Sequence, residues 1–260
     1  MSVVPLFDEL APGFDQLVPM FSAFATGLVD VMSLPPGTRL LDVGCGRGAV
    51  TRAALARGWE VVAVDAAPTM VTELRRDQPS VDARVMDAHA LDLPTDAFDA
   101  VAASFVIHIV DDPSQVLAEA RRVVRPGGLV AMTVPGPFSD QSRWDRYFGL
   151  LRDFTPDPET APVAPPTDVA ALFAVAGLDD YRQERLEIDL PVASPELAWR
   201  HEMSHGFAGY ARSLRPDDQR ELKRLALVEL QRMHDEGGIR FQRGAVAHLG
   251  RVGPPGAQSC

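Results

Sequence analysis

The sequence of 260 residues predicts an α/β fold, with a mostly parallel sheet and helices on both of its faces. Two observations carry this prediction. Short apolar runs alternate with helical patterns between Arg39 and Val134, as expected of successive strand–helix–strand units. Runs such as VVAV and LVAMTV are apolar at every position, which is typical of strands that helices cover on both sides.

The expected elements follow one another in a simple order. Apolar residues at spacings of three and four predict an amphipathic helix within Pro12–Ser33, which the PPG at residues 35–37 ends. Five strands are then expected at RLLDV, EVVAVD, ARVMD, FDAVAASF and GGLVAMTV. The Pro- and Asp-rich stretch Phe154–Thr167 predicts a long loop. A strand at ERLEIDLPV, two further helices and a final strand at GAVAHLGRV complete the chain.

The composition limits the classes of partner. A formal net charge of -11 argues against nucleic acid or an anionic membrane surface, because binding to either needs a basic patch. The only two cysteines, Cys45 and Cys260, indicate no disulfide framework. No segment has the pattern of a secretory leader or of a membrane-spanning helix. We therefore expect a cytoplasmic monomer or homodimer whose partner is a small molecule.

The most informative stretch is LLDVGCGRG, residues 40–48, where an apolar strand runs into three glycines and then a helix. Glycine adopts positive φ and has no Cβ, so a ligand can approach the backbone at the strand end and the helix N-terminus. The dinucleotide pattern G-x-G-x-x-G begins with Gly44 and Gly46, but its third position is Ala49. A dinucleotide ligand is thereby less favoured, although an alanine there still permits it.

Acidic residues end the next two strands. Asp65 lies about twenty residues beyond Gly44, where a carboxylate binds ribose hydroxyls in nucleoside-binding sheets. Asp87 and Ala88 follow the third strand. Either aspartate alone could be a loop residue or a helix N-cap. With the glycine turn, the two aspartates predict a site for a nucleoside that carries no pyrophosphate.

Four stretches, LLDVGCGRG, VVAVDAAPTM, MDAHALDLPTDAFDAV and EARRVVRPGG, resemble the class I S-adenosylmethionine-dependent methyltransferases in order and spacing. The resemblance is greatest to the group with the ubiquinone and menaquinone biosynthesis methyltransferases. It implies a Rossmann-like sheet of seven strands with the last one antiparallel, so that GAVAHLGRV closes the sheet. It also implies one methyltransferase domain over residues 1–260. Its expected parts are an N-terminal helical lid (1–36), a cofactor-binding core (37–135), and a substrate cap with the closing strands (136–260).

The resemblance also implies roles for individual residues. The glycine turn frames the methionine and ribose portions of S-adenosylmethionine, Asp65 holds both ribose hydroxyls, and Met70 presses on the adenine. Asp87 and Ala88 read the adenine edge, and the backbone carbonyl of Ser104 lies near the methionine ammonium. The implied cofactor residues are Asp42, Gly44, Cys45, Gly46, Gly48, Asp65, Ala66, Met70, Asp87, Ala88 and Ser104. The expected product is S-adenosylhomocysteine.

The sequence departs from many relatives at two places. Arg47 replaces a threonine, and Phe14-Asp15 replaces a Tyr-Asp pair. A hydroxyl contact to the cofactor carboxylate is therefore lost. We expect Arg47 either to replace that contact as a cationic partner or to be a solvated arginine on the first turn of a helix.

Methyl transfer from a sulfonium is an in-line displacement, so the protein mainly aligns the reactants and excludes water. A base is needed only when the accepting oxygen, nitrogen or carbon carries a proton that must leave, and a histidine suits that role. His108, in FVIHIVDDP after the fourth strand, is the candidate catalytic residue, with a structural role in orienting the DDP turn as its alternative.

The expected acceptor is a small apolar or aromatic metabolite. The Asn-Pro-Pro-aromatic signature of nitrogen methylation is absent, and the lid and cap regions are rich in aromatic residues. The candidate substrate residues are Phe14, Phe21, Trp144, Trp199 and Met203, each of which could instead belong to the core. Two other classes stay open: an NAD(P)-dependent oxidoreductase, and a methyltransferase-like binding or cyclising protein that transfers no methyl group.

Residues 201–205 read HEMSH, the pattern that binds zinc in many metalloproteases. Ser194 and Pro195 predict the start of a short helix and Gly206 its end, which places His205 in the last turn. His201 and His205 could share a metal, but no third-ligand motif lies nearby. We therefore predict no catalytic zinc and no other metal site, with the histidine pair facing solvent or the acceptor.

Overall fold

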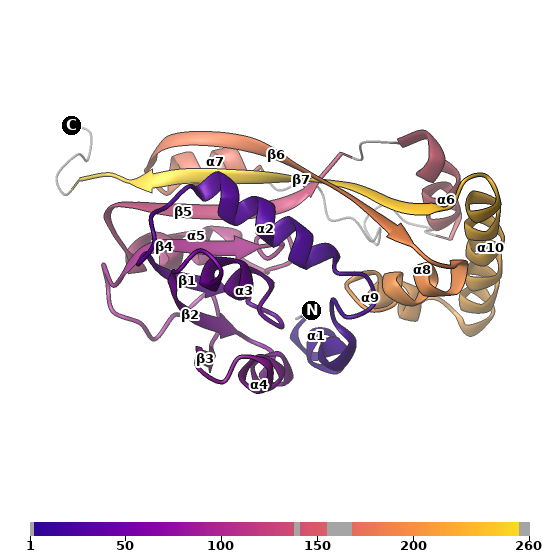
Figure 1. Cartoon of the computed structure of the whole chain (residues 1–260), viewed down its shortest axis with the longest axis horizontal. Helices are drawn as coiled ribbons and strands as arrows, with labels where there is room; N and C mark the ends of the chain where they lie inside the picture. Colours follow the sequence, from indigo (N-terminus) through magenta and orange to yellow (C-terminus); the bar gives the residue numbers. More distant parts are fainter. Residues whose placement is uncertain (1–2, 138–140, 155–167, 255–260) are drawn as a thin grey trace.

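The structure is a computed structural model, and it describes residues 3–137, 141–154 and 168–254. In these residues seven strands form one sheet in the order β3-β2-β1-β4-β5-β7-β6 (Figure 1). The strands are β1 (Arg39–Val43), β2 (Glu60–Asp65), β3 (Asp82–Val85), β4 (Phe98–Ser104), β5 (Val124–Gly136), β6 (Leu178–Val192) and β7 (Ile239–Val252). β1 to β5 pair in parallel, whereas β7 runs antiparallel between β5 and β6. The predicted Rossmann-like fold with an antiparallel last strand is confirmed.

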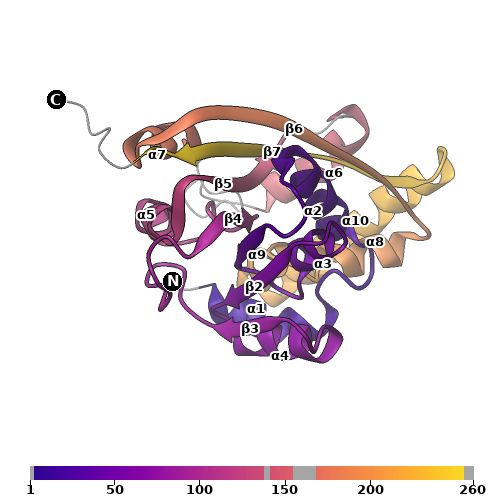
Figure 2. The same ribbon diagram turned by 60° about the vertical axis from the view of Figure 1, so that its left-hand side comes forward.

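Helices cover both faces of the sheet (Figure 2). They are α1 (Val4–Leu10), the 3-10 turn η1 (Ala11–Gly13), α2 (Met20–Met32), α3 (Ala49–Leu55), α4 (Pro68–Asp77), α5 (Pro113–Val123), α6 (Gln141–Asp153), α7 (Val169–Val175), α8 (Pro195–Glu202), α9 (Phe207–Ser213) and α10 (Pro216–Asp235). In β1, Leu40 packs with α2 and α3, whereas Leu41 packs on the opposite face with α5 and α7. This alternation explains why the central strands are apolar at every position.

The N-terminal segment differs from the single helix expected within Pro12–Ser33. The helix α2 begins only at Met20, and an earlier helix, α1, was not predicted. Asp15 has a φ of 56°, in the left-handed region, so a helix cannot continue through it into α2. Its carboxylate accepts hydrogen bonds from the backbone N–H groups of Phe21 and Ser22, both at 2.9 Å, and so caps the start of α2.

The C-terminal half forms a cap beyond the end of the sheet. The strands β6 and β7 extend past β5 and carry α6, α8 and α10 at their far end (Figure 1). These elements enclose a second apolar core, which includes Trp144, Tyr147, Phe241, Leu222 and Leu230. Two helices were predicted after β6, but the structure has three, because the helix α8 ends at Met203 and a separate helix, α9, follows it.

Two further predictions concern the loop at Phe154–Thr167 and membrane-spanning helices. Of the loop expected at Phe154–Thr167, residues 155–167 lie outside the described part of the chain. None of the described helices is both long enough and apolar enough to cross a bilayer.

Candidate active site

The glycine turn after β1 has its conformation because of three left-handed residues. Gly44, Gly46 and Gly48 have φ values of 64, 51 and 82. A Cβ on Gly44 would lie 2.3 Å from Cγ2 of Val106, and one on Gly48 would lie 2.5 Å from Cδ1 of Leu74. A Cβ on Gly46 would meet nothing closer than a ring carbon of Phe14 at 3.6 Å. Gly44 and Gly48 therefore allow close packing, whereas Gly46 leaves the backbone open to a ligand.

Two aspartates, Asp42 buried and Asp65 partly buried, hold this turn in place. The Asp42 carboxylate accepts hydrogen bonds from the Thr51 backbone N–H at 2.9 Å and from its hydroxyl at 2.6 Å. The Asp65 carboxylate, at the end of β2, accepts from the backbone N–H groups of Gly46 and Ala67, both at 2.8 Å. Burial raises the pKa of Asp42 to about 6 and also raises the pKa of Asp65, although the hydrogen bonds to each carboxylate oppose the increase.

Asp87 is more exposed than these two residues. Its Oδ1 atom accepts a hydrogen bond from the backbone N–H of His89 at 2.9 Å and lies 2.6 Å from Nδ1 of the same residue. These contacts lower the pKa of Asp87, so its carboxylate is ionised at neutral pH. Asp87 therefore offers a negative hydrogen-bond acceptor at the end of β3.

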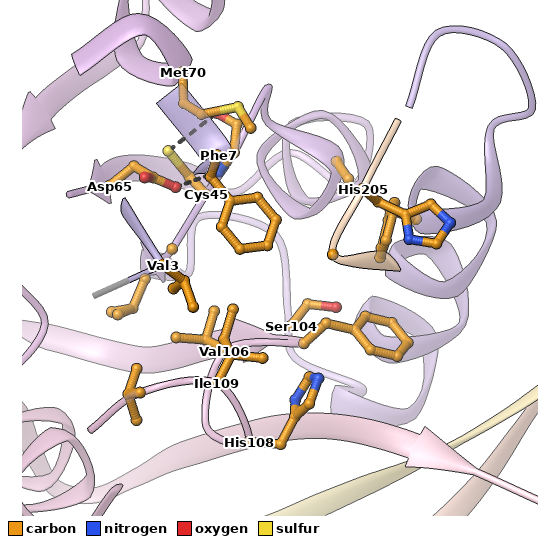
Figure 3. Close-up of a pocket in the computed structure, with 18 of the residues that line it drawn as sticks. Val3, Phe7, Cys45, Asp65, Met70, Ser104, Val106, His108, Ile109 and His205 are labelled. Atoms are coloured by element: carbon orange, nitrogen blue, oxygen red, sulfur yellow. Dashed lines mark hydrogen bonds between the residues drawn. The ribbon is translucent and has the colours of Figure 1, made fainter. Parts of the chain in front are cut away.

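These strand ends border one cavity of about 420 Å³, a size found for small-molecule sites. It is lined by the predicted residues Asp42, Gly44, Cys45, Gly46, Asp65, Ala66, Met70, Asp87, Ala88, Ser104, His108, Phe14 and Phe21. Gly48 is not part of the wall, because it lies one turn further on, under Leu74. Figure 3 shows Asp65 and Met70 on one side of the cavity, His205 on the other, and Ser104 and His108 between them.

The other predicted substrate residues do not line this cavity. Trp144, Trp199 and Met203 pack into the second core between α6, α8 and α10. Trp144 is 1% exposed, and its ring stacks beneath the guanidinium of Arg243 at 4.0 Å. An aromatic residue in a helix has the same sequence pattern whether it faces a cavity or a core, so only the packing separates the two.

Several lining residues were not predicted. The N-terminal segment contributes Val3, Val4 and Phe7, and the turn after β4 contributes Phe105, Val106 and Ile109. The cap contributes Glu202, His205, Arg243 and Gly244. Of these, Glu202 and His205 carried a sequence signal, because both belong to HEMSH.

The cap wall of the cavity contains a buried ion pair. A terminal guanidinium nitrogen of Arg243 lies 3.5 Å from Oε1 of Glu202, and the two side chains are 10% and 11% exposed. Burial lowers the pKa of Arg243, while the charge of Glu202 opposes this change. The two charges offset each other, so the cap end of the cavity is close to neutral.

Arg47 does not have either of the positions expected for it. Its side chain is 5% exposed and is not part of the cavity wall. It donates to the backbone carbonyl of Pro12 at 2.7 Å and forms ion pairs with Asp77 at 2.7 Å and Glu73 at 3.1 Å. Arg47 therefore joins the N-terminal segment to α4.

The HEMSH segment also differs from its predicted form. Ser194 caps α8 as expected, since its hydroxyl accepts from the Leu197 N–H at 3.1 Å. The helix ends at Glu202, however, and His205 lies in the turn before α9 rather than in a last helical turn. His201 is 1% exposed and so does not face solvent. Within the described residues, no group of three or more His, Cys, Asp or Glu side chains is arranged to hold a metal ion.

Comparison with known proteins agrees with this site. Residues 41–132 match the family described as a methyltransferase domain. The chain is 31% identical over 279 residues to the nocamycin O-methyltransferase of Saccharothrix syringae, covering 96% of this chain and 99% of the relative. It is 36% identical over 135 residues to a demethylmenaquinone methyltransferase of Renibacterium salmoninarum, covering 50% of this chain and 57% of that protein.

Solved structures show the same fold at lower identity. A phosphoethanolamine N-methyltransferase 2 of Haemonchus contortus, in complex with S-adenosyl-L-methionine, aligns with a TM-score of 0.54 and 17% identity, over 88% of this chain and 52% of that one. The [4+2]-cyclase SpnF aligns with a TM-score of 0.52 and 20% identity, over 88% of this chain and 81% of that one.

The fold and the site define the class as a Rossmann-like α/β enzyme with a small-molecule cavity at the carboxyl edge of its central strands. The near full-length match to a methyltransferase then shows the family: the chain belongs to the S-adenosylmethionine-dependent methyltransferases.

Proposed function

We propose that this chain transfers the methyl group of S-adenosylmethionine to a small, apolar or aromatic metabolite. The observation that carries the proposal is the continuity of the cavity, which reaches from Asp65 and Asp87 to the apolar and histidine side chains of the cap. Such a site suits methyl transfer, because donor and acceptor must be aligned in one enclosed place. The name of the nocamycin O-methyltransferase, which matches nearly the whole chain, supports the same activity.

The strand ends have the chemistry that the cofactor needs. Gly46 leaves its backbone open, Asp65 can accept hydrogen bonds from ribose hydroxyls, and Met70 offers an apolar surface to a base. Arg243 is the only arginine or lysine among the described lining residues, and it lies in the cap wall, so the glycine turn has no cation for a pyrophosphate. When bound, S-adenosylmethionine supplies an electrophilic methyl group on a sulfonium.

The N-terminal segment serves to exclude water from the cavity. Val3, Val4 and Phe7 line it. The Asp8 carboxylate accepts a hydrogen bond from the Thr69 backbone N–H at 2.6 Å, and Glu9 forms an ion pair with Arg212 at 2.8 Å. α1 is thereby joined both to α4, at the nucleoside end, and to α9 in the cap. We propose that it must move for the ligands to enter, as lids do in other enzymes.

His108 remains the proposed group that receives or orients a proton of the acceptor. It lines the cavity beside Phe105, with ring centroids 6.3 Å apart. Burial lowers the pKa of His108 to about 4, so its ring is neutral at neutral pH and can accept a hydrogen bond. A base this weak orients an acceptor hydroxyl by accepting its hydrogen bond, and it takes the proton only as methylation makes that oxygen strongly acidic.

The alternatives predict different products. An oxidoreductase is not favoured, since Ala49 replaces the third glycine and the relatives are methyltransferases. A cyclising protein has the likeness of fold to SpnF in its favour. Release of S-adenosylhomocysteine with an acceptor would distinguish methyl transfer from cyclisation.

Cofactor binding is tested by titration calorimetry with S-adenosylhomocysteine. We expect Asp65→Ala to weaken binding by about 1.5–3 kcal/mol, the typical contribution of hydrogen bonds to a charged group. Asp82→Ala is the matched control, because Asp82 lies on the outer strand β3, pairs with Arg84 and does not line the cavity. Equal affinity of the Asp65 variant and the unchanged protein would contradict the proposed cofactor site.

A further inference from the structure

The HEMSH segment places a histidine in the cavity wall that the proposed chemistry does not use. His205 lines the cavity from the turn between α8 and α9. Its Nε2 atom is buried and has no hydrogen-bond partner within the described part of the chain. A ligand in the cavity cannot reach an atom buried in this way, so the nitrogen that His205 offers to the cavity is the other one, Nδ1.

Ring contacts hold the His205 side chain in position, and its backbone carbonyl accepts from the Ala208 N–H at 2.9 Å. Its ring meets the Phe21 ring edge to face, with centroids 5.9 Å apart. Behind it, the His201 ring lies at 5.0 Å and in turn contacts Phe241 at 4.8 Å. Since His201 is 1% exposed, it forms a rigid support from the second core. The Nδ1 atom of His205 thus remains available to a ligand while the ring itself is fixed.

His205 is uncharged when the protein is at neutral pH. Burial, aided by the positive charge of Arg243, lowers the pKa of His205 to about 4. A neutral imidazole has one N–H donor and one bare nitrogen acceptor, so it can pair with a hydroxyl or a carbonyl. It also adds no positive charge that would repel a sulfonium.

A second histidine lies at the other end of a short aromatic path. Phe21 contacts Phe105 at 5.5 Å, and Phe105 contacts His108 at 6.3 Å. The Nδ1 atom of His108 is likewise buried, so Nε2 is the nitrogen that His108 offers to the cavity. The cavity therefore presents two neutral imidazoles separated by a pair of phenyl rings, and all four side chains line it.

We propose that the acceptor is an aromatic compound with two separated oxygen groups, one of which hydrogen-bonds His205 while the other lies at His108. Its ring body packs on Phe21 and Phe105. This inference rests on the proposed function, because it concerns the acceptor half of the same cavity. In it, His205 is a specificity-determining residue that no motif of the cofactor site includes.

The test uses three probes that differ only in hydroxyl groups: naphthalene, 2-naphthol and 2,7-dihydroxynaphthalene. Each is titrated against the full chain saturated with S-adenosylhomocysteine. We expect the diol to bind about 5- to 10-fold more tightly than 2-naphthol, the usual effect of one hydrogen bond. In His205→Leu this advantage should fall to about twofold or less, while 2-naphthol, held at His108, changes little. His205→Gln, which keeps a polar end group, should retain part of the advantage.

His234→Ala is the matched control, since His234 is an exposed histidine near the end of α10. It should keep the full advantage of the diol. The inference is overturned if the unchanged protein does not bind the diol more tightly than 2-naphthol, or if the advantage survives in His205→Leu. Calorimetry with S-adenosylhomocysteine separates this failure from a failure of the proposed function: normal cofactor affinity leaves the function standing, whereas absent cofactor binding removes it.

Discussion

The two ends of the cavity are built in different ways. At the nucleoside end, Asp65 and the glycine turn come from neighbouring stretches of chain, and their polar atoms are joined by hydrogen bonds to backbone N–H groups. At the cap end, Glu202 and His205 come from the HEMSH segment and Arg243 from β7, where Arg243 pairs with Glu202 and the His205 ring packs on His201. The first end suits a constant ligand and the second a variable one, because local backbone contacts tolerate fewer changes than side-chain packing does.

The largest expected effect on stability is at the cap end. Glu202→Gln removes the carboxylate that faces the buried Arg243, and we expect the free energy of unfolding to fall by about 3 kcal/mol or more, as for other broken buried pairs. Urea denaturation measures this change. Glu221→Gln is the control, because its ion pair with Arg224 on α10 is solvent-exposed and should contribute far less to stability. Equal losses in the two variants would show that the cap pair is no more important than a surface pair.

A slightly smaller effect on stability is expected from replacing Gly44 at the nucleoside end, and almost none from replacing Gly206 at the cap end. Gly44→Ala would place a Cβ 2.3 Å from Val106 in a residue with φ 64, so we expect a loss of about 2–4 kcal/mol from overpacking and left-handed strain. Gly206→Ala, at the cap end, meets no atom within 4 Å and should change stability by about 0.5 kcal/mol or less. Thermal and urea unfolding of both variants checks the contrast, and a stable Gly44 variant would argue against the close packing of the turn.

The smallest expected effect is on how stability depends on pH, and it should differ in sign between the two ends. His205 has a folded-state pKa of about 4, below its ordinary value, so its contribution to stability is complete above about pH 6.5 and is lost as the pH falls. Asp42 has a folded-state pKa of about 6, above its ordinary value, so its contribution is complete below about pH 4 and is lost as the pH rises.

Replacing His205 and replacing Asp42 should therefore change the pH dependence of the free energy of unfolding in opposite directions. Around pH 5, His205→Gln should reduce the slope of unfolding free energy against pH by about 1.4 kcal/mol per unit, and Asp42→Asn should increase it by about the same amount. Urea titrations at closely spaced pH values between about 4.5 and 6 measure both slopes. Slopes that change in the same direction, or not at all, would contradict the burial of these groups.

The nucleoside end could largely be located from the sequence. The spacing of Gly44, Gly46, Asp65 and Asp87 follows the strand–turn–helix units, and the carboxyl ends of parallel strands meet at one edge of a sheet. All four residues line the cavity for that reason. The cofactor contacts of these residues stay a prediction until they are measured.

The cap end could not be located in this way. Trp144 and Trp199 have the helical spacing of pocket residues but pack into a second core, whereas Arg243 has no local signal and reaches the cavity from the middle of β7. Arg47 is a similar case, since its partners Asp77 and Pro12 lie 30 and 35 residues away along the chain. Such contacts depend on how separate segments dock.

The sequence alone thus determined the α/β fold, the alternation of strands and helices in the central sheet, and the edge of that sheet at which the cavity lies. Those features follow from short-range periodicity and from glycine's freedom of φ. Only the tertiary structure decided that HEMSH breaks after Glu202, that His205 enters the cavity, and that Arg243 meets Glu202 across 41 residues of chain. The physical reason is that burial is a property of packed segments: the same histidine is hydrated and titrates near its ordinary pKa on an open helix, but it is held neutral inside a cavity.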